Sequence, residues 1–328
     1  MQLMILFMVA CYFPGDTVSG KILDGTHGGI GKAESLQLIL LENSMTVLGT
    51  LTNVEDSFSF ETTESLTGKR LLLQANKEGV LYSESIQWPS EDGIVLTVYD
   101  AVEEMPIKAS IGSVALYAYA QSVDIGLFYT LTNDSEPKKT LNRAEGTFSF
   151  DLIHGQTALE ASTRRGTLPL RQSLVVEGDR ATLQYSLKPG DTQLMVRTRH
   201  VYNPHEVNTI SLKLPEGQGA MKVLSLPASL ELEADGLVYI SEDTKENMSL
   251  YEWAPKEGVT ELRIKVKGKP LDKPMDEAGS GSNQTADTKA AHATKVERRP
   301  HPLDEYRWAI IAGLLAIFTT FAVVGARR

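Results

Sequence analysis

Between its two ends, the chain alternates apolar and polar residues in the way that is typical of β-strands. Phe58 and Phe60, for example, alternate with polar neighbours, and similar short runs recur along the chain with Gly, Pro, Asn or Asp in most gaps. Helical periodicity is scarce, and this spacing of short strands is typical of β-sandwiches. The other predicted strands cover residues 71–75, 94–99, 114–120, 126–131, 147–152, 181–187, 193–201, 209–214, 236–240, 248–253 and 259–266.

This pattern predicts an all-β fold with two consecutive β-sandwich domains. We place the boundary near residues 99–106, where the strand at 94–99 is followed by a short acidic run that starts at Asp100. The first sandwich then covers residues 21–98. The second region covers 99–270, which has room for one large sandwich or two small ones.

The C-terminal end contains one long apolar segment. Residues 308–326 contain no charged side chain and are flanked by Arg307, Arg327 and Arg328. A helix of that length rises about 28 Å, close to the hydrocarbon core of about 30 Å, whereas a buried helix of a soluble protein would keep a polar face. We therefore predict a transmembrane helix over 307–326, with the last two arginines in the cytoplasm because positive residues stay inside.

A polar segment, residues 271–306, separates the predicted β-domains from this helix. It has few large apolar side chains and includes a Gly-Ser-Gly-Ser run. Such a composition cannot bury enough apolar surface to offset chain entropy. We expect a disordered stalk, a flexible linker with a mean reach of roughly 30 to 35 Å.

The N-terminal end has the features of an export signal. An apolar stretch over residues 3–13 is followed by small residues at 18–20, where a signal peptidase would cut, although no Lys or Arg precedes Lys21. The alternative is a lipoprotein box at residues 8–11, with Cys11 acylated as the new N-terminus. A signal peptide over 1–20 and the C-terminal span together predict a single-pass type I protein of the cell membrane, with the bulk of the chain outside the cytoplasm.

Charge and cysteine content exclude several classes of site. The net charge is −10, which opposes phosphate attraction, so we expect no nucleic-acid partner. The single cysteine, Cys11, excludes intramolecular disulfides, cysteine-rich zinc sites and iron–sulfur clusters.

The first predicted domain resembles the carboxypeptidase regulatory-like domain, a small transthyretin-like β-sandwich with a carbohydrate-binding-like fold. Residues 20–26 (GKILDGT) match its first strand motif, residues 50–60 its third, and residues 68–82 its last. The sequence departs from the motif at Asp56, where the turn glycine is missing, and at Leu72, where an aromatic residue is usual. Residues 99–270 are more loosely similar to the part that follows this module in membrane-anchored bacterial proteins. The resemblance implies a scaffold and no catalytic residues.

One glycine-rich string resembles a phosphate-binding loop without completing it. In residues 25–33 (GTHGGIGKA), Thr26 stands where the first glycine is needed and Ala33 stands where Mg²⁺ needs a hydroxyl. An exported chain would also meet little nucleotide. We interpret the string as a glycine-rich connection between strands and expect no nucleotide and no cofactor.

The histidines offer no clear metal site. His200 and His205 are five residues apart, which on a strand points their rings to opposite faces, and Pro204 precludes a helix that carries both. We therefore interpret them, with Glu206, as surface residues at a strand end. The remaining histidines, at 27, 154, 292 and 301, are isolated in the sequence.

Four aromatic residues are the candidates for ligand binding: Tyr82, Trp88, Tyr251 and Trp253. Exposed rings of this kind stack on sugar faces in carbohydrate-binding sandwiches. The alternative is that they belong to the cores, since each aromatic side chain buries about 150 to 250 Å².

These features favour a non-enzymatic, membrane-anchored envelope protein whose β-sandwiches act as spacer or interaction modules, with an envelope protein or a polysaccharide as partner. The alternative is a carbohydrate-binding envelope protein that uses the first sandwich. A third hypothesis, an accessory domain of an enzyme or a hydrolase, lacks a readable catalytic motif, and a eukaryotic type I glycoprotein would usually contain disulfides.

Overall fold

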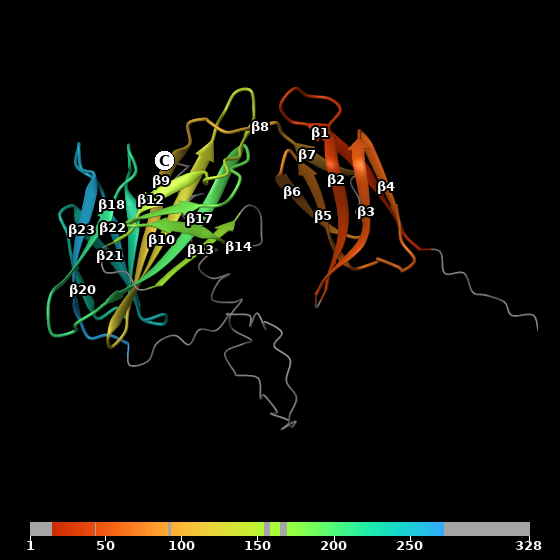
Figure 1. Cartoon of the computed structure of the whole chain (residues 1–328). Helices are drawn as coiled ribbons and strands as arrows, with labels where there is room; N and C mark the ends of the chain where they lie inside the picture. The colour runs from red at the N-terminus through yellow and green to blue at the C-terminus, as the bar shows by residue number, and fades with distance from the viewer. Residues whose placement is uncertain (1–14, 43, 91–92, 154–157, 165–168, 272–328) are drawn as a thin grey trace, which may run out of the picture. The chain divides into compact units, whose positions relative to one another are not determined.

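The regular elements of the computed structural model are all β-strands (Figure 1). The structure describes residues 15–42, 44–90, 93–153, 158–164 and 169–271. No helix occurs among these residues, so the all-β prediction is confirmed. None of the described residues form a helix long and apolar enough to cross a membrane. The predicted transmembrane helix and most of the predicted signal and linker lie outside the described residues.

Seven strands form the first sandwich: β1 (Thr17–Asp24), β2 (Lys32–Leu41), β3 (Met45–Glu55), β4 (Ser57–Glu61), β5 (Arg70–Lys77), β6 (Val80–Gln87) and β7 (Ile94–Val98). They make two sheets, in the orders β4-β1-β7 and β3-β2-β5-β6. Strand β4 shows how the alternation works, because Phe58 and Phe60 are buried while their polar neighbours are exposed. Together with Ile22, Leu38 and Leu73, these rings form the core of this sandwich.

The first sandwich begins before the predicted boundary at residue 20. Thr17 to Gly20 pair in register with β4, and Val18 is fully buried. The carboxylate of Asp16 also accepts a hydrogen bond from the amide of Leu66, at 2.5 Å. A cut at 18–20 would remove half of β1 and one core side chain. The cleavage site at 18–20 stays a prediction, and cleavage there would take these β1 residues out of the sandwich.

The second region is built on one eight-stranded sheet, in the order β14-β13-β17-β10-β9-β19-β22-β21. Two three-stranded sheets, β12-β16-β15 and β18-β23-β20, complete it. Its strands are β9 (Lys108–Ala118), β10 (Ser122–Asn133), β12 (Phe148–Asp151), β13 (Ala158–Arg164), β14 (Pro169–Gln172), β15 (Leu174–Glu177), β16 (Arg180–Leu183), β17 (Gly190–Val201), β18 (Asn208–Lys213), β19 (Met221–Leu226), β20 (Leu230–Glu233), β21 (Leu237–Asp243), β22 (Met248–Trp253) and β23 (Glu261–Gly268).

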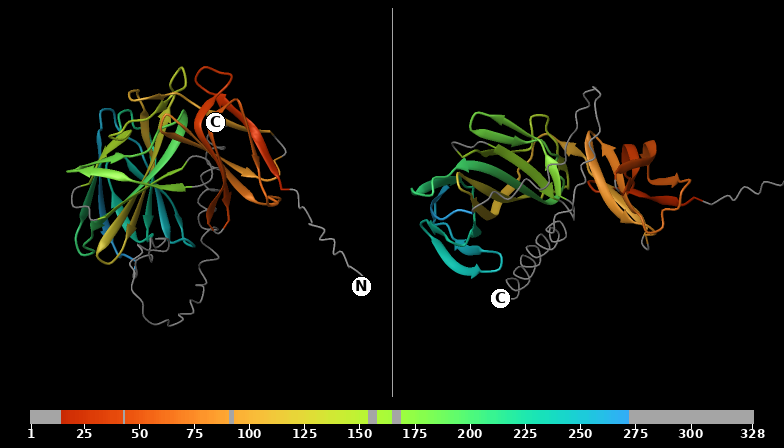
Figure 2. Two further views of the ribbon diagram at one scale, coloured as in Figure 1. Left: turned by 45° about the vertical axis from the view of Figure 1, so that its right-hand side comes forward. Right: turned by 90° about the horizontal axis from the view of Figure 1, so that it is seen from below.

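This region is one large sandwich and not two small ones. A single hydrophobic cluster joins the large sheet to both small sheets, through residues such as Ile125 of β10, Leu183 of β16 and Ile264 of β23. Figure 2 shows these strands, coloured yellow to blue, from two further directions. The last described residue, Leu271, still belongs to the fold, because its amide donates to the carbonyl of Ala118 at 2.9 Å.

Two very short strands connect the sandwiches. Strand β8 (Ala101–Val102) follows β7 directly and pairs in parallel with β11 (Thr140–Leu141), which comes from the large sandwich. The predicted boundary near 99–106 thus falls on a segment that is hydrogen-bonded. We call the contacts around it, made by residues 24–27, 77–82, 99–102 and 138–142, the junction.

Candidate functional site

Three of the four aromatic candidates are core residues. Tyr82 and Trp253 are each 2% exposed and Tyr251 is 9% exposed, while Trp88 is half-buried against the first core. A ring that stacks on a sugar must present one face to solvent. The expectation of exposed rings is therefore wrong for Tyr82, Tyr251 and Trp253, and the core alternative applies to them.

The polar atoms of the two aromatic residues in β22 are used within the fold. The indole N–H of Trp253 donates to the carbonyl of Asp235 at 2.8 Å, and the hydroxyl of Tyr251 donates to the carbonyl of Leu230 at 3.4 Å. Burial raises the pKa of the Tyr251 hydroxyl above its ordinary value. Both side chains fasten β22 to the segment around β20.

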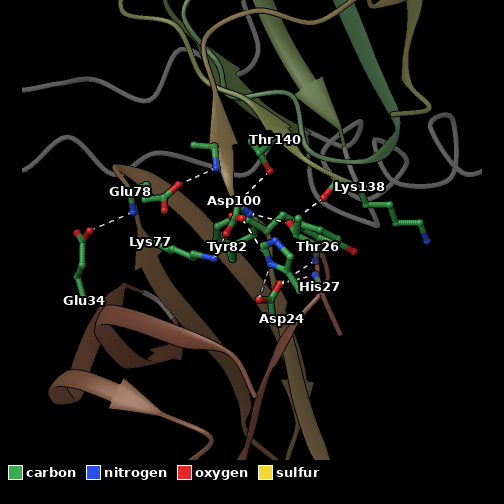
Figure 3. A network of polar contacts seen from close by, with 12 residues as sticks. Asp24, Thr26, His27, Glu34, Lys77, Glu78, Tyr82, Asp100, Lys138 and Thr140 are labelled. Atoms are coloured by element: carbon green, nitrogen blue, oxygen red, sulfur yellow. Dashed lines mark hydrogen bonds and ion pairs between the residues drawn. The ribbon is translucent and has the colours of Figure 1, made fainter. Parts of the chain in front are cut away.

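Tyr82 lies at the junction, which Figure 3 shows from close by. Its hydroxyl donates to the carbonyl of Tyr99 at 2.9 Å and lies 2.8 Å from Oγ1 of Thr140. The ammonium of Lys188 lies 5.6 Å from the centre of its ring. Burial raises the pKa of Tyr82, so the hydroxyl keeps its proton at neutral pH and stays a donor.

The glycine-rich string at 25–33 forms the connection between β1 and β2, as predicted. A Cβ atom at Gly25 would lie 2.2 Å from the ring of Tyr99, so only glycine fits where the turn passes this ring. Gly28 and Gly29 adopt φ angles of 80° and 86°, which favour glycine. Lys32 pairs with Glu55 at 2.9 Å.

This turn brings together three groups that can ligate a metal. Nδ1 of His27 lies 3.2 Å from Oδ2 of Asp24 and 3.6 Å from Oδ2 of Asp100. The ligand atoms of the three residues all lie within 4.8 Å of one another, and they are the only such group among the described residues. The expectation that His27 is isolated is therefore wrong.

The register of two strands explains why Asp100 joins residues so distant in sequence. Asp24 is paired with Val98 in the parallel ladder of β1 and β7. The chain leaves β7 at that point, so Asp100 follows two residues later beside the turn that carries His27.

The carboxylate of Asp100 is already paired with a lysine. Nζ of Lys77 donates to its Oδ1 at 2.6 Å, in a partly buried position. A metal ion would have to share this carboxylate with an ammonium group, while His27 occupies the other oxygen. The donor set would suit a cation that takes nitrogen and oxygen ligands, but the charges of Lys77 and the carboxylates already make an ion-paired network.

The protonation of Asp24 follows from this network. Partial burial raises the pKa of Asp24, but hydrogen bonds from the amides of His27 and Thr26, together with the His27 ring and the charge of Lys77, outweigh burial and hold the pKa below its ordinary value. Asp24 is thus a charged acceptor at neutral pH, and its Oδ1 caps the turn through the amides of Thr26 at 2.8 Å and His27 at 3.1 Å.

Further hydrogen bonds cross from one sandwich to the other. The hydroxyl of Thr26 donates to the carbonyl of Lys138 at 2.8 Å and accepts from the amide of Asp100 at 2.9 Å. Glu78 accepts from the amide of Ala101 at 2.7 Å through its side chain. Its carbonyl accepts from Nδ2 of Asn142 at 3.3 Å. The arrangement is that of a polar lock between two domains.

The two histidines of the second region differ in burial. His200 is buried in β17 and lies 3.3 Å from Oγ1 of Thr198, whereas His205 is exposed beyond the strand. The expectation of two surface histidines is therefore wrong for His200. Its position opposite Val123 in β10 places it on the core face of the sheet.

Comparisons with known proteins identify no relative: no family model matches the chain, and no curated protein matches it.

Proposed function

We propose that this chain is a non-enzymatic, membrane-anchored protein of the cell envelope that presents two joined β-sandwiches outside the cytoplasm. The observation that carries the proposal is the junction. Its Asp, His, Lys and Tyr side chains have the composition of a reactive site, yet they bond to one another and to the connecting strands. Such a lock suits a spacer, because it resists bending between domains.

The first sandwich supports the proposed kinship with carboxypeptidase regulatory-like domains at the level of architecture. Seven strands in sheets of three and four suit a small sandwich of that kind. A carbohydrate-binding function of the first sandwich would rest on Trp88, because the other candidate ring there, Tyr82, is buried at the junction.

The membrane anchor and the orientation are proposed from the sequence. The uncharged segment 308–326 and its flanking arginines favour a span with the C-terminus in the cytoplasm. Charged residues cost about 2.5 to 3.5 kcal/mol each at mid-membrane, so the reverse orientation, which carries two arginines across, is disfavoured.

A pair of reporter fusions in cells tests this orientation. Alkaline phosphatase, which is active only outside the cytoplasm, is fused after Pro270 in one chain and after Arg328 in the other. We expect activity from the first fusion and none from the second. A stable but inactive fusion after Pro270 would reject the extracytoplasmic assignment.

A further inference from the structure

Strand β21 leaves its apolar residues uncovered. Val238, Tyr239 and Ile240 are 60%, 53% and 49% exposed, although they are consecutive residues of one strand. A strand at a sandwich surface normally buries every second side chain. In β21, only Leu237 packs against the core, and the Tyr239 ring contacts that of Tyr251 at one edge. The rest of this apolar surface is left open by the described part of the chain.

This strand also has a free backbone edge. Among the residues that the structure describes, it is the last strand of the eight-stranded sheet and pairs on one side, with β22. A bulge at Ile240 divides the strand into two short segments, Leu237–Tyr239 and Ser241–Asp243, that stay in register with β22. An exposed sheet edge offers N–H and C=O groups to another extended chain.

The opposite edge of the same sheet is protected. Strand β14 begins with Pro169, which has no N–H to offer, and carries Arg171, which discourages pairing with another chain. Strand β21 has neither a proline nor a basic residue along its length. The difference marks β21 as the edge that is open to a partner.

The charge around β21 defines the kind of partner. Residues 230–246 contain six acidic side chains and one lysine, a net charge of −5, whereas the whole chain of 328 residues carries −10. Two of the acids are paired with lysines, Asp235 with Lys256 of the connection after β22 at 2.7 Å and Glu233 with Lys265 of β23 at 3.4 Å. Glu242 and Glu246 are exposed near the end of the strand. A second copy of this acidic edge would be repelled.

We propose that β21 binds an extended, basic polypeptide segment of another protein, which adds a strand to the large sheet. Its backbone pairs with the edge of β21, its apolar side chains cover Val238, Tyr239 and Ile240, and its Lys or Arg side chains face Glu242 and Asp243. The bulge limits the ladder to short segments, so the complex is transient. This inference rests on the fold of the large sandwich and is independent of membrane orientation.

A fluorescent peptide tests the edge on the purified full-length chain in detergent. The probe is an acetylated octapeptide that alternates lysine and valine, and binding is followed by fluorescence anisotropy. We expect saturable binding that weakens with salt. The double substitution Glu242→Lys and Asp243→Lys should weaken it roughly tenfold, because two attractions become repulsions, and Leu170→Lys at the protected β14 edge should leave it unchanged.

Two further peptides in the same experiment distinguish strand addition from simple charge attraction. The same peptide with every second amide N-methylated should lose binding, since it cannot complete the ladder, and a glutamate–valine peptide should not bind. Equal binding of the methylated peptide, or no saturable binding of the lysine peptide, would overturn the proposal. Dimerisation that Tyr239→Lys abolishes would overturn it as well, since β21 would then serve a second copy.

Discussion

The junction and the β21 edge differ in which side chains they bond and which they leave exposed. At the junction, groups that could do chemistry are bonded to one another, as Lys77 is to Asp100 and Tyr82 to Thr140. At the edge, chemically inert side chains such as Val238 and Ile240 are left in solvent. Reactive composition at the junction therefore does not by itself indicate a site, whereas uncovered apolar surface on a sheet edge is the feature on which the β21 proposal rests.

The largest effect should come from a charge placed in the core of the first sandwich. Val18→Asp puts a carboxylate where Val18 is fully buried, and a buried unpaired charge costs about 3 to 5 kcal/mol. Hydrogen exchange by mass spectrometry should show β1, β4 and β7 unprotected. Ser19→Asp, on the exposed side of the same strand, is the control and should change protection little. Normal protection in Val18→Asp would contradict the placement of β1.

The next effect concerns the support beneath the β21 edge. Trp253→Ala removes a buried indole and its hydrogen bond to Asp235, which should lower the free energy of unfolding by about 3 to 5 kcal/mol. Urea denaturation measures this loss, and peptide binding at β21 should fall with it. An unchanged urea midpoint would show that this indole is not part of the core.

A smaller effect on stability should distinguish a tyrosine at the junction from a tyrosine at the β21 edge. Tyr82→Phe leaves the oxygens of Thr140 and Tyr99 without a buried partner, at a cost of about 1 to 3 kcal/mol. Tyr239→Phe, at a half-exposed position, should stay within about 0.5 kcal/mol. Equal losses of stability for the two variants would contradict the claim that the hydroxyl of Tyr82 is bonded at the junction while Tyr239 is exposed at the edge.

The smallest effect depends on pH. Because the pKa of Asp24 is lower in the folded chain than its ordinary value of 3.8, its charge stabilises the fold fully above that ordinary value. This contribution is lost as the pH falls through the lowered pKa. Asp24→Ala should thus cost about 1 kcal/mol at pH 7, where the amides of Thr26 and His27 lose their acceptor.

Urea denaturation at pH 7 and near pH 3 checks this prediction. The gap between the wild type and Asp24→Ala should narrow on acidification. Asp134→Ala, which removes an exposed carboxylate, is the control and should change little at either pH. If the stability difference between the wild type and Asp24→Ala grew in acid, the charged form of Asp24 would not be the one that stabilises the fold.

Alternation in the sequence located several strands that bury one clear face, although it missed β19, which buries every second residue. The predicted strand at 248–253 coincides with β22, and those at 193–201 and 259–266 overlap β17 and β23. Strands β14 and β15 escaped prediction, because Leu170, Val175 and Val176 are exposed and leave no buried alternation to detect. Whether residues 99–270 form one sandwich or two depended on long-range pairing, such as the parallel ladder of β19 with β9, which local periodicity does not encode.

The same limit applies to the site. Asp24 and His27 are three residues apart in a glycine-rich turn, so their proximity was readable from the sequence. Asp100 joins them only through the β1–β7 register. Tyr82 was selected for its ring, but its position in β6 beside β11 makes it a junction residue. Tyr239, which the sequence analysis did not select, is the exposed aromatic residue of β21.

A double-mutant cycle across the junction tests most directly whether the two sandwiches are joined. Tyr82→Phe, Thr140→Val and the double variant are compared with the wild-type chain by urea denaturation. We predict a coupling free energy of about 0.5 to 1.5 kcal/mol, since Tyr82 and Thr140 share a hydrogen bond of 2.8 Å in a buried position. Strictly additive losses would show that the two residues do not meet in solution, and would contradict the proposal of a locked spacer.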